Sequence, residues 1–319
     1  KNAVEIQNLK KDLSQLNYES NELNIKLLSA GYYLDLFKLY NQEKVYHKNI
    51  ELAQERLDNI NKFYKQGMVT RNDVIRGELQ LSNLKLALQV VQNNQSILNK
   101  QLTVALGLDE GVKIIPDESI VTESLEILPL ASYYGDLVNH PTIKQTEKAV
   151  DIYAVSEKIS RSDMMPSLSA FAGNTLQRPI TTSNPAMDMY TNGWSAGLSL
   201  NFNIDALFKA PKKIQLNRLE KEKAIRQSNE VSEMMKVAVN AAHIKYNEAL
   251  TQNNTLKVNK DLTAENYRIM ESKYNNQLAI LLDLIDASNA KLDAELQFAN
   301  SEINIVFAYY KLLKEAGTL

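Results

Sequence analysis

Apolar residues recur at steps of three and four along most of the chain, the spacing of a long helix that packs along a seam. Residues 46–64 hold a first run, made of Tyr46, Ile50, Ala53, Leu57, Ile60 and Tyr64. Residues 81–102 hold a second run, made of Leu81, Leu84, Leu88, Val91, Gln95, Leu98 and Leu102. A single break at residues 66–70 separates the two runs, so we expect a helical hairpin with a tight turn.

The C-terminal part of the chain repeats this hairpin at an offset of 210 residues. Its last helix steps by four and three through Leu292, Leu296, Ala299, Ile303, Val306, Tyr310 and Leu313. Aligned without a gap, the two parts have identical residues in the pairs Tyr64–Tyr274, Asp73–Asp283 and Gly107–Gly317. Two leucine-rich helices can share leucines by chance, but matching Tyr, Asp and Gly at the same turn and the same end is harder to explain in that way. We interpret this as an internal duplication. Thr70 or Asn72 is expected to cap the second helix, and the two glycines are expected at helix ends.

Between the hairpins the period changes from 3.6 to 2. In residues 194–204 every even-numbered residue is apolar, and the odd ones are small and uncharged. This matches the about 9–11 alternating residues of a tilted bilayer-spanning strand, with Trp194 at the interface. Residues 167–176 alternate more weakly, and a loop is expected over about 177–193. Two strands cannot close a sheet, so a membrane location requires further copies of the chain.

Composition narrows the function classes. All seven prolines fall between residues 116 and 211, which leaves two long proline-free arms. The chain has no cysteine, which excludes disulfides and thiolate metal sites. Its net charge of −2 argues against nucleic acid as a partner. The three histidines, His47, His140 and His243, lack metal-ligand spacing, so we expect no enzyme, no cofactor and no metal site.

These patterns predict a mainly α fold of long antiparallel helical hairpins with one β-hairpin. The expected parts are a first-repeat hairpin over 1–107, a linker over 108–131, a helix over 132–164 that crosses His140-Pro141, a β-hairpin over 165–204 and a second-repeat hairpin over 205–319. The arms alone are also typical of a soluble coiled-coil structural or adaptor protein with a β-hairpin insert.

The sequence resembles the TolC family of bacterial outer-membrane efflux proteins along its whole length. The resemblance rests on the order and spacing of several short strings, which are Tyr64-Lys-Gln-Gly67, Asn72-Asp73-Val74, His140-Pro141, Met165-Pro166-Ser167-Leu168, Trp194-Ser-Ala-Gly197-Leu198, Tyr274 and Asp283-Leu-Ile-Asp286-Ala287. The family fold implies a homotrimer with a shared membrane β-barrel and a helical barrel through the periplasm. In that barrel each helix touches a neighbour on both sides, as two seams per helix require.

The resemblance also implies a function and partners. A family member is an outer-membrane exit duct of a tripartite efflux or type I secretion system, set in outer-membrane lipid and extending into the periplasm. Its partners are a periplasmic adaptor protein and an inner-membrane pump. The sequence does not indicate the transported substrate.

Several residues acquire expected roles from the same resemblance. Asp283 and Asp286 match acidic rings at the periplasmic entrance, where three copies of each would favour cations. The entrance contacts implied are Tyr274, Asp73 and Tyr64, and the adaptor-docking tips are Gly67, Met68, Val69, Gln277 and Leu278. The lipid-facing side of the second strand is Trp194, Ala196, Leu198, Leu200 and Phe202. A family arginine is replaced by Ala279, so Arg71 or Lys273 is the candidate partner of Asp73.

One imbalance remains between the two repeats. The second repeat begins with a helix and a strand pair over 131–210, whereas the first has no counterpart of these residues before Lys1. We therefore expect the chain to be an N-terminally shortened part of a longer protein, with about 80 residues preceding Lys1.

Overall fold

A computed structural model describes residues 2–109, 111–117, 119, 125, 127–179, 184–185 and 187–319. The chain divides into two compact units, one of residues 1–17 with 142–232 and one of residues 18–141 with 233–319. Parts of the expected linker and of the expected loop lie outside the described residues. None of the helices in the described ranges is long and apolar enough to cross a membrane.

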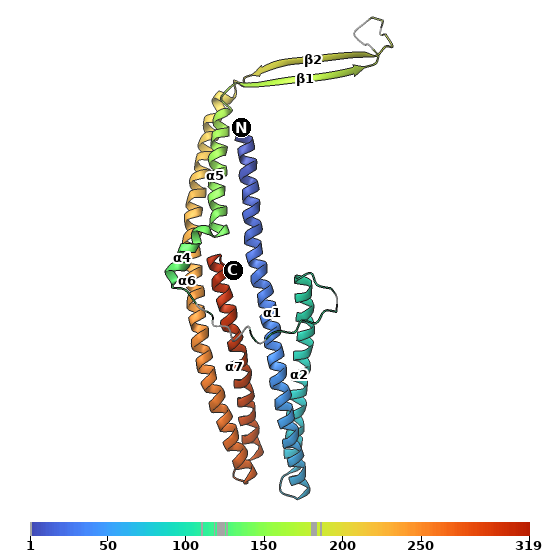
Figure 1. Cartoon of the computed structure of the whole chain (residues 1–319), viewed down its shortest axis with the longest axis vertical. Coiled ribbons are helices and arrows are strands. Elements are labelled where there is room, and N and C mark those ends of the chain that lie inside the picture. The colour runs from blue at the N-terminus through green and yellow to red at the C-terminus, as the bar shows by residue number, and fades with distance from the viewer. Residues whose placement is uncertain are drawn as a thin grey trace. The chain divides into compact units, whose positions relative to one another are not determined.

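Four long helices dominate the fold, shown in Figure 1. They are α1 (Asn2–Lys65), α2 (Arg71–Ala105), α6 (Ala206–Asn275) and α7 (Leu281–Ala316). The absence of interior prolines permits this length. The one exception is Pro211, which lies in the second turn of α6 and leaves the Leu207 carbonyl without the N–H donor of an ordinary helix.

The second unit orders these helices as α2, α1, α7 and α6. Between α1 and α2, Gln95 Nε2 donates to Glu43 Oε2 at 2.8 Å. The contact between α1 and α7 includes a 3.1 Å bond from Asn49 Nδ2 to Glu295 Oε2. From α6 to α7, Asn253 Nδ2 donates to Ser301 Oγ at 2.9 Å. The middle helices are therefore α1 and α7, and α2 and α6 form the two edges (Figure 1).

The apolar core of this unit lies toward the two helical turns. Its buried members come from both hairpins and are Ala53, Leu57, Ile60, Val74, Leu81, Leu84 and Leu281. A second cluster lies farther along the same helices and is made of Leu34, Phe37, Ile303 and Val306. Ala53, Leu57, Ile60, Leu81, Leu84, Ile303 and Val306 belong to the seams read from the sequence, whereas Leu34, Phe37, Val74 and Leu281 do not.

One charged side chain is buried within the core near the turns. Arg56 of α1 is only 8% exposed, and it donates to partners on the three other helices. Nη1 donates to Gln80 Oε1 at 2.8 Å, and Nη2 donates to Tyr267 Oη at 3.0 Å and to Ser288 Oγ at 3.2 Å. Tyr267 in turn donates to Glu271 Oε1 at 2.7 Å. A single guanidinium thus joins the two hairpins.

In the first unit, α5 (Pro141–Ser162) packs between the start of α1 and the first half of α6. Gln145 Nε2 donates to the Leu16 carbonyl at 3.0 Å, and Asn217 Nδ2 donates to Ser160 Oγ at 2.6 Å. The prediction of one helix through His140-Pro141 was wrong. A short helix α4 (Leu130–Asp136) and a 3-10 turn η1 (Leu137–Asn139) precede α5, because the residue before a proline is driven to extended backbone.

The sheet is a two-stranded antiparallel hairpin of β1 (Ser167–Gln177) and β2 (Thr191–Asn201). β2 begins and ends three residues earlier than the alternation indicated, so Phe202 lies beyond the strand. The reason is that pairing sets the strand length, because Gln177 pairs with Thr191 at one end and Ser167 with Asn201 at the other. Residues 203–207 already turn into α6 through short-range hydrogen bonds.

The two faces of this hairpin differ sharply in polarity. The register places Leu168, Ala170, Ala172, Trp194, Ala196, Leu198 and Leu200 on one face. The other face carries small or polar residues apart from Phe171, whose ring lies against Gly197. Both strands are exposed along their length, and Trp194 is 81% exposed. The apolar face is therefore uncovered in the single chain.

We predict that Arg56→Ala destabilises the second unit by about 2–4 kcal/mol, because Gln80, Tyr267 and Ser288 all lose a buried partner. Arg268→Ala removes an exposed arginine beside Tyr267 and is the matched control, with an expected change within about 0.5 kcal/mol. Chemical denaturation followed by circular dichroism measures both. Equal stability of the two variants would contradict the role given to Arg56.

A second prediction concerns His140, which is buried against Gly317 at the end of α7. Burial lowers the pKa of His140, and a hydrogen bond with the Lys314 backbone offsets this only in part, with Lys314 and Glu315 the charged neighbours. The neutral ring therefore stabilises the fold fully above about pH 6.5, the value in an unfolded chain. That contribution is lost as the pH falls from there through the lower folded pKa.

Denaturation midpoints measured between about pH 5 and pH 7.5 should fall on the acid side. His140→Gln should flatten this decline, whereas His243→Gln, on α6, should retain it. A decline that persists unchanged in His140→Gln would assign it to other groups.

Candidate functional site at the helical turns

The first turn joins α1 to α2 through a closed set of hydrogen bonds. Met68 N donates back to α1 at 2.9 Å, and Gly67 has a φ of 74°, which glycine adopts without steric cost. Thr70 N donates to Asp73 Oδ2 at 2.8 Å, and Asp73 N donates to Thr70 Oγ1 at 3.3 Å. This is a capping box, so Thr70 rather than Asn72 is the N-cap of α2.

The second turn repeats this geometry between α6 and α7. Leu278 N donates to the Lys273 carbonyl at 2.8 Å, and Gln277 has a φ of 60° without being glycine. Ile280 N donates to Asp283 Oδ2 at 3.4 Å. This bond is equivalent to the one from Thr70 N to Asp73 Oδ2 in the first turn. Because Ile280 has no hydroxyl, the second helix start has only half of the capping box.

Asp283 and Asp286 lie on the exposed side of α7. Their neighbours Leu281, Leu284 and Ala287 face the core and are buried. The two carboxylates therefore share the side of the helix that the single chain leaves open. Asp283 also accepts the bond that begins α7, so its carboxylate serves the helix terminus as well.

The structure brings Tyr274 and Asp73 together but leaves Tyr64 apart. Tyr274 is half-buried, and its Oη is buried without a hydrogen-bond partner among the described residues. Burial raises the pKa of Tyr274, and the negative charge of Asp73 raises it further. Tyr64, its counterpart in the first repeat, is exposed. Arg71 lies 3.6 Å from Glu78, so its charge is directed away from Asp73.

Tyr274 and Asp73 line a cleft of about 310 Å³ between the two turns. Other lining residues are Phe63, Met68, Val69, Thr70, Asn275, Gln277, Ala279, Ile280 and Leu281. Of the expected docking residues, Met68, Gln277 and Val69 take part in the cleft, whereas Leu278 is exposed outside it. The cleft and the buried Arg56 were not anticipated, since a heptad pattern shows which side of a helix packs but not which side chains of two hairpins meet.

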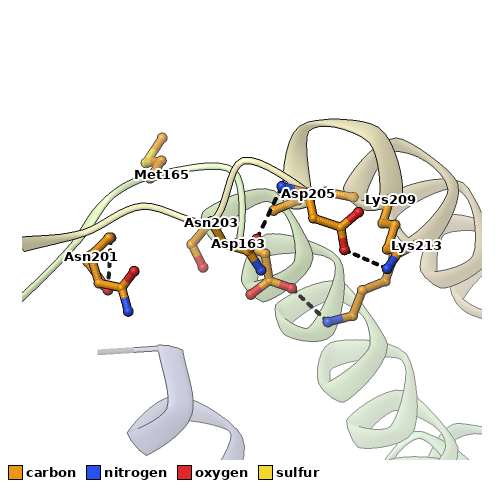
Figure 2. A pocket seen from close by; sticks show the side chains of 11 residues that line it. Asp163, Met165, Asn201, Asn203, Asp205, Lys209 and Lys213 are labelled. Carbon is orange, nitrogen blue, oxygen red and sulfur yellow. Dashed lines mark hydrogen bonds and ion pairs between the residues drawn. The ribbon is translucent and has the colours of Figure 1, made fainter.

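A second polar group lies where the strands meet the helices, shown in Figure 2. Lys213 Nζ lies 2.6 Å from Asp163 Oδ2, and Lys209 pairs with Asp205 one turn earlier on α6. Asp205 N also bonds to Asn203 Oδ1 at 3.1 Å, which shapes the start of α6. Both ion pairs are solvent-exposed and therefore contribute little to stability, and the one from Lys213 joins α6 to the residue that follows α5.

Comparison with known proteins decides the family. A family profile described as outer membrane efflux protein matches residues 133–318. The chain belongs to the outer membrane efflux protein family. This contradicts the alternative of a soluble coiled-coil protein, and it assigns the chain the efflux-channel function and the outer-membrane location of that family. No curated protein sequence matches the chain.

Solved structures of outer-membrane channels share the fold of this efflux protein. The outer-membrane channel OprN is 17% identical with a TM-score of 0.84, and the match covers 100% of this chain and 71% of OprN. VceC from Vibrio cholerae is 15% identical with a TM-score of 0.82, covering 99% and 75% of the two chains. The Campylobacter jejuni CmeC channel has the same identity and TM-score, covering 99% and 67%.

Proposed function

We propose that this efflux protein forms the wall of an exit duct, as a homotrimer whose strands complete a barrel in the outer membrane and whose helices extend into the periplasm. The observation that carries the proposal is an exposed heptad seam on each edge helix of the second unit. A solvent-exposed apolar seam at coiled-coil spacing is a packing surface without its partner.

The seam on α2 lies opposite the side that contacts α1. Its members step by seven and four and are Leu79, Leu86, Val90, Ile97 and Val104, which are 49–67% exposed. The seam on α6 steps by three, seven, fourteen, four and seven, and is made of Met234, Val237, Ile244, Val258, Leu262 and Ile269. The middle helix α7 carries no comparable exposed seam along its described length.

Two different apolar edges predict a head-to-tail contact between copies. The α2 edge of one copy packs against the α6 edge of the next, and such a heterologous interface closes into a ring. The β-hairpin has the same need, because its two open edges and its uncovered apolar face are tolerated in lipid only inside a closed sheet. Trp194, Ala196, Leu198 and Leu200 then face the lipid.

The helical turns are the proposed contact with a periplasmic adaptor protein, which links the duct to an inner-membrane pump. The support is the exposure of Gly67, Met68, Gln277 and Leu278 at the ends of the two hairpins. The two turns differ in their helix capping, and Gly67 of the first turn is replaced by Gln277 in the second. We therefore expect the two turns to contact the adaptor unequally. Asp283 and Asp286 are proposed to form the acidic rings of the entrance.

We predict that charging the α2 seam abolishes the ring. Val90→Glu with Ile97→Glu places carboxylates in the apolar interface, where their desolvation opposes assembly. Analytical ultracentrifugation of the purified protein should show trimers for the wild type and monomers for the variant. Ser82→Glu with Gln89→Glu adds the same charge at exposed positions outside the seam and should leave trimers intact. Trimers in both variants would exclude this interface.

A further prediction concerns the acidic rings. Asp283→Ala with Asp286→Ala should reduce block by divalent cations in planar-bilayer recordings by about tenfold or more, because the rings concentrate cations. Glu230→Ala with Glu233→Ala removes the same charge from an exposed part of α6 far along the helix from the turn, and should leave the block unchanged. Identical block in both double variants would place the cation site elsewhere.

A further inference from the structure

We propose that the cleft between the two helical turns is a binding site for a small organic amine that carries one positive charge and an aromatic or aliphatic body. The cleft does not include Asp283 or Asp286, and it shares Met68, Val69 and Gln277 with the proposed adaptor contact. The proposal rests on the lining of the cleft, on its single charge and on one polar group without a partner.

The walls of the cleft combine apolar and polar groups, and they come from both hairpins. Phe63 and Val69 belong to the first hairpin, and Ile280 and Leu281 belong to the second. Ala279 is small, which leaves room between these walls. A volume of about 310 Å³ suits a ligand smaller than a typical drug, held mainly by burial of its apolar body.

The polar groups of the cleft determine the charge of its ligand. Asp73 is the one acidic residue among the lining residues, and none of those residues is lysine, arginine or histidine. Asp73 accepts bonds from Thr70 through Oδ2, and an amine can approach the same carboxylate from the cleft. The charge of Arg56 also reaches Tyr274, but Arg56 is held by Gln80, Tyr267 and Ser288 and does not line the cleft. The charge of the lining is therefore that of Asp73, which favours a cation.

Tyr274 adds a directional contact. Its Oη is buried and lacks a hydrogen-bond partner among the described residues, although a buried hydroxyl normally has one. An amine held by Asp73 lies beside Tyr274, because Asp73 is near enough to alter the ionisation of that phenol. The ligand nitrogen, or a water bound with it, then forms hydrogen bonds with both the Asp73 carboxylate and the Tyr274 hydroxyl. The apolar body of the ligand contacts both hairpins.

The binding experiment uses the purified trimer in lipid nanodiscs and 4-phenylbutylamine as the probe, measured by isothermal titration calorimetry against empty nanodiscs. We expect a dissociation constant of about 0.1–1 mM, since the ligand is small. The neutral analogue 4-phenylbutanol, which has the same body, should bind about tenfold more weakly or worse.

Variants locate the site. Asp73→Asn should weaken amine binding about tenfold or more, and Tyr274→Phe about fivefold, while the preference for amine over alcohol disappears only in Asp73→Asn. Asp261→Asn is the matched control, because Asp261 is an exposed aspartate of α6 that does not line the cleft. It should bind the amine as the wild type does.

Ala279→Phe fills the cleft without touching either helix cap, and it should abolish binding of amine and alcohol alike. If circular dichroism shows that Asp73→Asn unfolds the turn, the Ala279→Phe variant tests the binding site in its place. Equal binding of amine and alcohol, loss of binding in Asp261→Asn, or unchanged binding in Ala279→Phe would each overturn the proposal. None of these results bears on trimer formation, which the α2 seam variants test separately.

Discussion

Each edge helix of the second unit carries apolar residues on two opposite sides, and one chain covers only one of them. On α2 the buried side includes Val74, Leu81 and Val91, while Leu86 and Val90 remain exposed. A helix with two such sides is stable only between two neighbours, as in a wall. In the proposed ring, the neighbouring copy meets this requirement by covering the second side of each edge helix.

The internal duplication produces two hairpins with the same backbone but different chemistry at their ends. Asp73 and Asp283 occupy equivalent positions and both accept a backbone bond at a helix start. Only the first has a hydroxyl partner in Thr70, and only the second turn has a residue other than glycine in the left-handed conformation. The first turn is therefore the more firmly fixed of the two, and the second has the weaker cap.

Sequence reasoning succeeded where local patterns determine the structure. Heptad spacing identified helical segments in α1, α2 and α7, and the break between the runs located the turn at residues 66–70, because these depend on residues close in sequence. Thr70 was one of the two expected caps of α2, and the structure decides for it. Sequence reasoning failed where pairing or a distant partner decides. The ends of β2 depend on β1, and the break at His140 depends on the next residue, whose effect on the backbone was overlooked. Arg56 gave no signal because its partners lie up to 232 residues away.

Phe171 of β1 and Gly197 of β2 affect the inner diameter of any barrel that these two strands help to close. The phenyl ring is the one large group on the small-residue face, and a Cβ at residue 197 would lie 2.8 Å from its Cζ atom. The glycine lets the ring lie flat along the sheet instead of standing out from it. In a closed barrel each copy would contribute one such ring. In such a barrel, the missing methyl group at residue 197 would leave room for each ring against the sheet.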